Sequence, residues 1–221
     1  MTIDQAYQFV QFVANKEQRG NITPDQFNML APLMQMSFIN DRIGNLKKYR
    51  PHDPIPEYGY GITRKAREEL RPITVVAALT ALGGGDFTLP SDFLYAITVN
   101  NSANAAILKE TVRDEDFIIY TSVIKPPTVE FGTYSMRSSF LTVTPASIIP
   151  RLMYIKKPTD PRWNYTNVNN SPVYTPTGSV NFSVSELSHI EICMKILQAV
   201  GVNLSNDKIL TYAGMEEAKG S

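Results

Sequence analysis

The residues best suited to chemistry lie close together near the carboxyl end of the sequence. His189 and Cys193 are four residues apart, so a helix would place the histidine and the thiol on one side. A base that takes the thiol proton would make the cysteine a nucleophile. Cys193, however, lies within an apolar run, where a buried thiol carries little thiolate. The pattern therefore favours a buried small side chain over a catalytic pair, and we expect no enzyme activity.

Two further motifs resemble ligand sites only in part. Residues 83–85 are three successive glycines, but the lysine and threonine of a phosphate-binding loop do not follow them. Residues 114–116 are all acidic, yet they lack the glycine and the alternating ligands of a calcium loop and are typical of a helix start. One cysteine and two histidines are too few for a structural zinc site. We expect no catalytic residue, no metal and no bound cofactor.

The composition is that of a globular chain without a strong electrostatic preference for any partner. Its 221 residues, 43% of them hydrophobic, can bury a core in one domain or in two closely joined ones. The 21 basic and 21 acidic residues cancel, so no overall field attracts nucleic acid or an acidic membrane. The amino-terminal residues 1–20 lack the pattern of a secretion signal, and no apolar run is long enough to span a membrane. We expect a protein that is made and kept in the cytoplasm.

One small basic group leaves an alternative open. Lys47, Lys48 and Arg50 follow a predicted helix and could face passing nucleic acid. They are not interleaved with aromatic residues, as a surface that stacks bases would be. Contacts with a neighbouring protein are the interpretation that we favour.

Two helices are predicted at the amino terminus. Thr2 and Gln5, and again Thr23 and Gln26, have the spacing of a capping box, in which side chains bind free amides of the first turn. Apolar residues then recur every three or four positions. Pro24 fits the first position of the second helix, where its missing N–H is not needed. We expect the two helices to form an antiparallel pair.

A third helix is predicted near the carboxyl terminus. Ser183 and Glu186 repeat the capping-box spacing, and Gly201 supplies a left-handed stop before a second, shorter helix. Glu191 and Lys195 have the spacing of an ion pair within the helix. The expected buried stripe consists of Leu187, Ile190, Met194 and Leu197, widened by Cys193, Ile196 and Val200.

The middle of the sequence has strand patterns separated by turn residues. The three glycines of residues 83–85 indicate a hairpin turn, and residues 114–122 are the one helical candidate in this part. We expect an antiparallel β unit of roughly five or six strands. The expected strands are residues 73–81, 87–99 with a break at Pro90, 105–112, 128–135, 140–144 and 148–156.

These patterns predict a fold of the α+β class with three parts. Residues 1–72 form an amino-terminal helical part, and residues 73–182 form the β unit with aromatic and proline-rich loops. Residues 183–221 form carboxyl-terminal helices that pack on the amino-terminal part. We expect the central antiparallel β unit to project from the packed terminal helices.

Two loops combine large aromatic side chains with prolines, and we take both as candidate interfaces. Aromatic side chains bury a large area while losing little rotamer entropy. For Trp163 the alternative is equally open, namely that it caps the core of its own chain. A further alternative is a carbohydrate-binding or ligand-binding β module, in which aromatic rings stack on a sugar or other ligand. The interface candidates are Ile55, Tyr58 and Tyr60 in the first loop, and Trp163, Tyr165 and Tyr174 in the second, which are also the candidate ligand-binding residues.

Several phrases of the sequence resemble one kind of protein. They are LPSDFLY at 89–95, IPRLMYIKKP at 149–158, PRWNY at 161–165 and the final helix. With them the chain resembles neck proteins of tailed phages, in particular the head–tail connector or ring (adaptor) proteins of crAss-like and related short-tailed phages. The resemblance extends from Thr2 to Lys219 and includes no catalytic signature.

The resemblance implies a structural virion protein located in the neck or tail and synthesised in the host cytoplasm. Such proteins form rings, commonly of about twelve copies, whose subunits need two different complementary surfaces. The ring docks on the portal protein, contacts other neck or tail proteins and extends the channel through which DNA leaves, without sequence-specific binding. The resemblance implies no enzyme activity, and the balanced charge predicts no membrane partner. The long β region departs from simpler connector proteins, which are largely helical.

Overall fold

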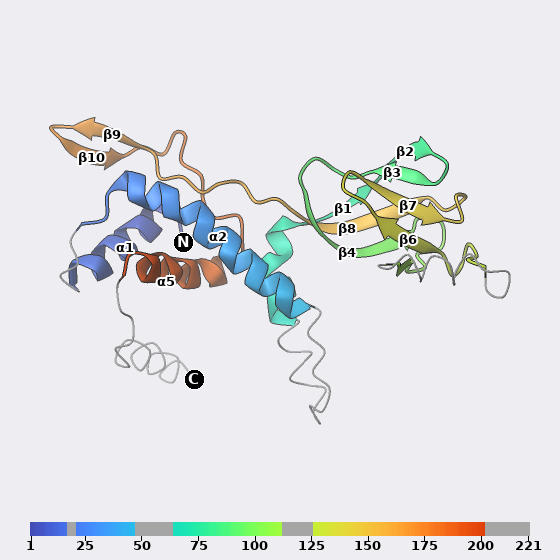
Figure 1. Cartoon of the computed structure of the whole chain (residues 1–221). Helices are drawn as coiled ribbons and strands as arrows, with labels where there is room; N and C mark the ends of the chain where they lie inside the picture. The colour runs from blue at the N-terminus through green and yellow to red at the C-terminus, as the bar shows by residue number, and fades with distance from the viewer. Residues whose placement is uncertain (17–20, 47–63, 112–125, 202–221) are drawn as a thin grey trace, which may run out of the picture. The chain divides into compact units, whose positions relative to one another are not determined.

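A computed structural model of the chain describes residues 1–16, 21–46, 64–111 and 126–201 (Figure 1). The fold is mixed α+β, as the sequence predicts. The chain divides into a helical unit, Met1–Pro72 with Pro158–Ser221, and a β unit, Ile73–Lys157. The helical unit therefore draws on both ends of the sequence, whereas the β unit is one continuous stretch.

Some predicted features lie outside the described residues. They are the helix at 114–122 with its acidic run, the aromatic loop at 51–61, the basic group at 47–50 and the short helix after residue 201.

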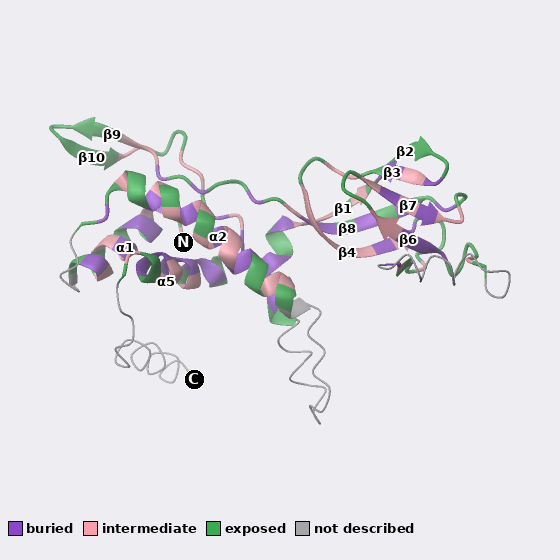
Figure 2. Ribbon diagram, in the orientation of Figure 1, coloured by how far each residue is buried: buried purple, intermediate pink, exposed green. Residues whose placement is uncertain are grey.

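The helical unit is organised around its last described helix. This helix, α5 (His189–Ala199), packs against both α1 (Ile3–Lys16) and α2 (Pro24–Leu46). The backbones of α1 and α2 approach each other closely at fewer positions, so α5 is the main connection between the two. Residues 64–70 are also helical and lead into the short 3₁₀ turn η1 (Arg71–Ile73). Buried positions follow the inner sides of these helices (Figure 2).

Both amino-terminal capping boxes are confirmed. The backbone N–H of Gln5 donates to Thr2 Oγ1 at 3.3 Å, and the N–H of Thr2 donates to Gln5 Oε1 at 2.9 Å. Thr23 and Gln26 make the same reciprocal bonds at 3.3 and 3.0 Å. Each box satisfies amides that the first turn leaves free, so α1 and α2 begin where the local sequence places them.

The start of the carboxyl-terminal helix differs from the prediction. Ser183 does not cap a helix, because its hydroxyl lies 2.7 Å from Thr159 Oγ1 and its N–H donates to Gln35 Oε1 at 2.8 Å. The chain instead makes a 3₁₀ turn, η2 (Glu186–Ser188), and α5 begins at His189. Gly201 does end the helix with a left-handed φ of 84°.

The predicted buried stripe of this helix was wrong for Leu187 and Ile190. Leu187 lies in the 3₁₀ turn η2, before α5 begins, so the helical spacing counted from it does not apply. Packing against two helices selects the buried set, and Leu187 and Ile190 are exposed instead. The buried apolar residues of α5 are Ile192, Cys193, Ile196 and Leu197.

The charges of α5 join helices to one another and do not pair within α5 as predicted. Lys195 Nζ lies 2.8 Å from Asp41 Oδ2, at the far end of α2. Arg42 lies 2.5 Å from Glu191 and 2.5 Å from Glu69, which is buried in the helical residues 64–70. One arginine thus connects three helical segments.

The β unit contains two sheets around one core. Alternating residues of the central strands point inward, and Leu152 of β8 and Leu141 of β7 are completely buried in a shared apolar cluster. The three-stranded sheet has the order β1-β8-β4 and the five-stranded sheet the order β2-β3-β7-β6-β5. The strands are β1 (Thr74–Ala78), β2 (Thr80–Gly83), β3 (Asp86–Thr88), β4 (Phe93–Asn101), β5 (Lys109–Glu110), β6 (Thr133–Met136), β7 (Phe140–Thr144) and β8 (Pro150–Lys156).

The described β unit has more strands than expected because the chain changes sheet within two of the predicted runs. β1 lies in the three-stranded sheet and β2 in the five-stranded sheet, with the buried Leu79 between them. The chain returns between β3 and β4, across Pro90. Each of the predicted runs 73–81 and 87–99 therefore divides into two strands. One pair, β5 and β6, is parallel, so the β unit is not wholly antiparallel.

The β unit is also shorter than the predicted 73–182. It ends at Lys157, and Pro158 begins the second part of the helical unit. This part includes an unpredicted hairpin of β9 (Tyr165–Val168) and β10 (Ser171–Tyr174). The physical reason is the burial of Trp163 among the helices, described next.

Candidate interaction surfaces

Trp163 lies at the centre of an aromatic cluster in the helical unit. Its ring centroid is 4.2 Å from that of Tyr7 on α1, and only 3% of the residue is exposed. The indole N–H donates to Asp4 Oδ1 at 2.9 Å. Its backbone N–H and carbonyl both bond the Asn28 side chain of α2, at 2.8 and 3.0 Å. The position of Trp163 matches the second of our two interpretations, a side chain that caps the core of its own chain.

Tyr165 and Tyr174 pack on the same indole. Their ring centroids lie 5.6 and 5.8 Å from that of Trp163, in stacked orientation. The Tyr165 hydroxyl donates to Asp25 Oδ1 at 3.1 Å, and this bond to a carboxylate raises the pKa of Tyr165. The structure thus brings the three aromatic candidates of the second loop together. Tyr165 and Tyr174 cover the buried indole of Trp163, within the helical unit. The other three interface candidates, Ile55, Tyr58 and Tyr60, lie outside the described residues.

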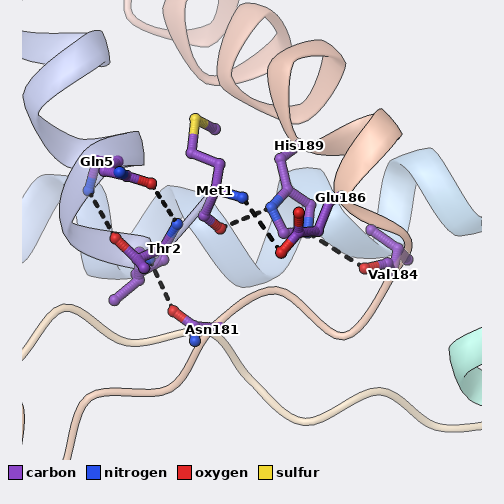
Figure 3. A network of polar contacts seen from close by, with 8 residues as sticks. Met1, Thr2, Gln5, Asn181, Val184, Glu186 and His189 are labelled. Carbon is purple, nitrogen blue, oxygen red and sulfur yellow. Dashed lines mark hydrogen bonds and ion pairs between the residues drawn. The ribbon is translucent and has the colours of Figure 1, made fainter.

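His189 and Cys193 do not form a catalytic pair in this arrangement. His189 Nδ1 lies 2.9 Å from the carbonyl oxygen of Met1, and Nε2 lies 3.2 Å from that of Val184 (Figure 3). Both ring nitrogens are therefore directed at backbone. Cys193 is completely buried, and desolvation raises its pKa to about 12. A thiol in that state supplies almost no thiolate near neutral pH.

The same histidine helps to hold the first residues of the chain. The α-amino group of Met1 lies 3.5 Å from Glu186 Oε1, and the N–H of Ile3 donates to Asn181 Oδ1 at 2.8 Å (Figure 3). The sequence offers no sign of this network, because its members are separated by nearly the whole chain. Its role in the structure is to fix the start of α1 against α5.

Within residues 1–16, 21–46, 64–111 and 126–201, neither a metal site nor a phosphate-binding loop is formed by the motifs considered above. No group of three or more His, Cys, Asp or Glu side chains is placed to hold a metal ion there. The three glycines form the β2–β3 turn, each with positive φ, as the sequence predicts. The carbonyl of Gly85 accepts a 2.8 Å bond from the N–H of Val143.

Two pairs of exposed apolar side chains on the helical unit are better candidates for a functional surface. Met29 and Leu33 are one turn apart on α2, and we call this pair the α2 surface. Leu187 of the turn η2 and Ile190 of α5, 83% and 60% exposed, lie at the start of the helix, and we call this pair the α5 surface. Sequence reasoning placed Leu187 and Ile190 in the core. No local pattern indicated their exposure, because the capping-box spacing of Ser183 and Glu186 placed the start of the helix too early.

The two surfaces belong to different elements of the helical unit. On α2, the buried Ala31 lies two residues from Met29 and two from Leu33, so the exposed pair is on the opposite side of the helix. On α5, Ile190 lies seven residues before the buried Leu197, so it is at the edge of the buried side of the helix, in the first turn. The two pairs of apolar side chains therefore form two separate surfaces on different elements.

Comparison with known proteins adds no family to this description. No helix among the described residues has both the length and the apolar character that crossing a membrane requires. No protein-family model matches the chain, and no curated protein matches it either.

Proposed function

We propose that the chain is a structural subunit of a ring in the neck of a tailed phage, between the portal and the tail. The observation that carries this proposal is the presence of two separate apolar surfaces, one on α2 and one at the start of α5. Adjacent apolar side chains kept in water favour association, since burial gains about 25 cal/mol per Å². The α2 surface of one copy can therefore meet the α5 surface of the next.

Contacts between two different surfaces repeat from copy to copy and close into a ring when the rotation between copies allows it. The sequence resemblance to connector proteins supports a ring of about twelve copies that docks on the portal protein and contacts other neck or tail proteins. The function then is to extend the DNA channel. Balanced charge suits this role, because a strongly basic channel would retain the DNA that passes through it.

The arrangement of the best chemical candidates supports assembly as the function. Cys193 is buried with a raised pKa, and both nitrogens of His189 face carbonyl oxygens. The alternative of a carbohydrate-binding or ligand-binding module loses its central residue, because Trp163 is buried and lies in the helical unit. No observation in the described residues favours that alternative over assembly.

The test is the mass of the chain, alone and mixed with the portal protein of the same phage, by native mass spectrometry. We expect complexes that contain many copies of the 24.7 kDa chain. The double substitution Met29→Glu with Leu33→Glu should prevent their formation, because it places two like charges on the α2 surface. Asn40→Glu, also exposed on α2, is the matched control and should assemble normally. A chain that stays monomeric and ignores the portal would contradict the proposal.

A further inference from the structure

The β9–β10 hairpin has an outer edge that nothing described in the chain occupies. Among the described residues, β9 and β10 pair only with each other. Asn169 and Asn170 connect them, with φ of 50° and 63°. Two successive positive values are typical of a two-residue type I′ turn. This turn determines which backbone groups point into the hairpin and which point out.

Hydrogen-bonded pairs alternate with open pairs along an antiparallel hairpin. Val168 and Ser171 flank the turn and form the first hydrogen-bonded pair. Four residues farther along, the N–H of Thr175 donates to the carbonyl of Asn164 at 2.8 Å, which agrees with this alternation. Every second pair between these two makes no hydrogen bonds across the hairpin. We call such pairs open, and their backbone N–H and C=O groups point outward.

The two outer edges of the hairpin are not equivalent. The open pairs are Asn167 with Pro172 and Tyr165 with Tyr174. Pro172 has no N–H, so the outer edge of β10 lacks a donor in its middle. On β9, both Asn167 and Tyr165 direct N–H and C=O outward, two residues apart. A strand added beside β9 would form hydrogen bonds with every second residue, which is the spacing of Tyr165 and Asn167.

The β9 edge carries no charged side chain that would oppose pairing. Natural edge strands commonly carry charged side chains that prevent association. Residues 163–185 contain no charged residue at all. On one face of the hairpin Val168 and Val173 are exposed, so a strand laid beside β9 would also cover apolar surface.

We propose that β9 is a strand-addition site and that its occupant is β2 of a second copy of this chain. β2 is the outer strand of the five-stranded sheet, all four of its residues are exposed, and none is charged. Because β9 and β2 are different surfaces, their pairing continues from one copy to the next, as a ring requires. The inference rests on the proposed function and names one contact that joins adjacent subunits.

Asn167→Pro tests the edge directly. The substitution removes the outward N–H of β9 and, because position 167 faces Pro172 in an open pair, leaves the bonds within the hairpin in place. We expect the concentration needed for assembly to rise at least about tenfold, a loss of about 1.4 kcal/mol per contact. Asn167→Thr changes the side chain but keeps the N–H, and it should assemble like the natural chain. Pro172→Thr restores a donor to the β10 edge and should produce larger, open-ended assemblies.

Hydrogen exchange separates failure of this inference from failure of the proposed function. In the assembly, the amides of Tyr165, Asn167 and those of β2 that point away from β3 should gain protection, whereas Thr166 and Val168 should be protected throughout. An assembly in which Tyr165 and Asn167 still exchange freely, and which tolerates Asn167→Pro, would overturn strand addition and leave the ring intact. Protection of β9 without protection of β2 would overturn the choice of occupant. Absence of any assembly, with or without the portal protein, would overturn the proposed function itself.

Discussion

The helical unit and the β unit are held together in different ways. In the helical unit, side chains from distant parts of the sequence bind one another, as Trp163 does with Asp4 and Asn28. In the β unit, backbone ladders join strands of one continuous stretch around a single apolar core. In the helical unit, which is made of two chain segments, these long-range polar and aromatic contacts therefore add to the packing of the helices. Loss of one such contact should therefore damage the helical unit far more than the β unit.

Of the four substitutions, Trp163→Ala should lower the stability of the helical unit the most. It removes the centre of the aromatic cluster and the hydrogen bond to Asp4, and we expect a loss of about 3–5 kcal/mol in the stability of the helical unit. Urea denaturation followed by hydrogen exchange of each unit measures it. Trp163→Phe is the control, since it keeps a ring and loses mainly the hydrogen bond, about 1 kcal/mol. An equal loss of hydrogen-exchange protection in the β unit would show that the two units do not depend on different contacts.

Arg42→Met should have the next largest effect. Without the guanidinium, the buried carboxylate of Glu69 has lost its charged partner, and the link to Glu191 on α5 is gone. We expect the helical unit to lose about 2–3 kcal/mol, measured by the same denaturation experiment. Arg42→Lys retains the charge but cannot bind two carboxylates with a planar fork, so an intermediate loss is expected. Full stability of Arg42→Met would show that the ionic contacts are dispensable.

Gly85→Ala should destabilise the β unit and leave the helical unit unchanged. A Cβ atom at this position would lie 2.7 Å from the carbonyl oxygen of Val143, and φ is 92°, a region unfavourable for alanine. We expect a loss of about 1–3 kcal/mol that is confined to the β unit. Gly84→Ala is the control, because a Cβ atom there would meet nothing within 4 Å, and its effect should be smaller. Destabilisation of the helical unit by Gly85→Ala would contradict the separation.

Thr23→Ala should have the smallest effect of the four. It removes the oxygen that accepts from the N–H of Gln26 and leaves the other contacts of α2 unchanged. Loss of such a cap costs about 1 kcal/mol, and circular dichroism during thermal unfolding can detect it. Thr23→Ser keeps the hydroxyl and should restore nearly all of the lost stability. An effect as large as that of Trp163→Ala would mean that local capping, and not long-range contact, controls the helical unit.

Local patterns in the sequence were sufficient for many elements of both units. The capping boxes at Thr2 and Thr23 marked the starts of α1 and α2 correctly, since both partners of each box are three residues apart. The glycines at 83–85 marked the β2–β3 turn for the same reason. Such signals depend on neighbouring residues only, so the rest of the fold does not alter them.

Long-range competition explains where the prediction failed. Ser183 has the local pattern of a cap, but Thr159 and Gln35 bind its hydroxyl and its N–H. In the same way, Glu191 and Lys195 have the spacing of a pair within one helix, yet each has a partner on α2. Nothing in the sequence near these residues identifies the distant group that takes the place of the local one.

The candidate sites show the same division. The sequence correctly drew attention to Trp163, Tyr165 and Tyr174, because large rings on an ordered loop need something to pack against. It could not decide between an interface and an internal cap, since that depends on Tyr7 and Asp4 at the other end of the chain. The exposed Leu187 and Ile190 were missed because the helix was predicted to start at Ser183, whereas Leu187 lies in the turn η2 and α5 begins at His189.

The most direct test of assembly as the function is the amount of this chain in purified phage particles, measured by quantitative mass spectrometry relative to the portal protein. A subunit of a neck ring should be present in a fixed ratio to the portal, near one chain per portal subunit, and should remain through repeated purification. Absence of the chain from the particles, or a ratio that varies from one preparation to the next, would contradict the account.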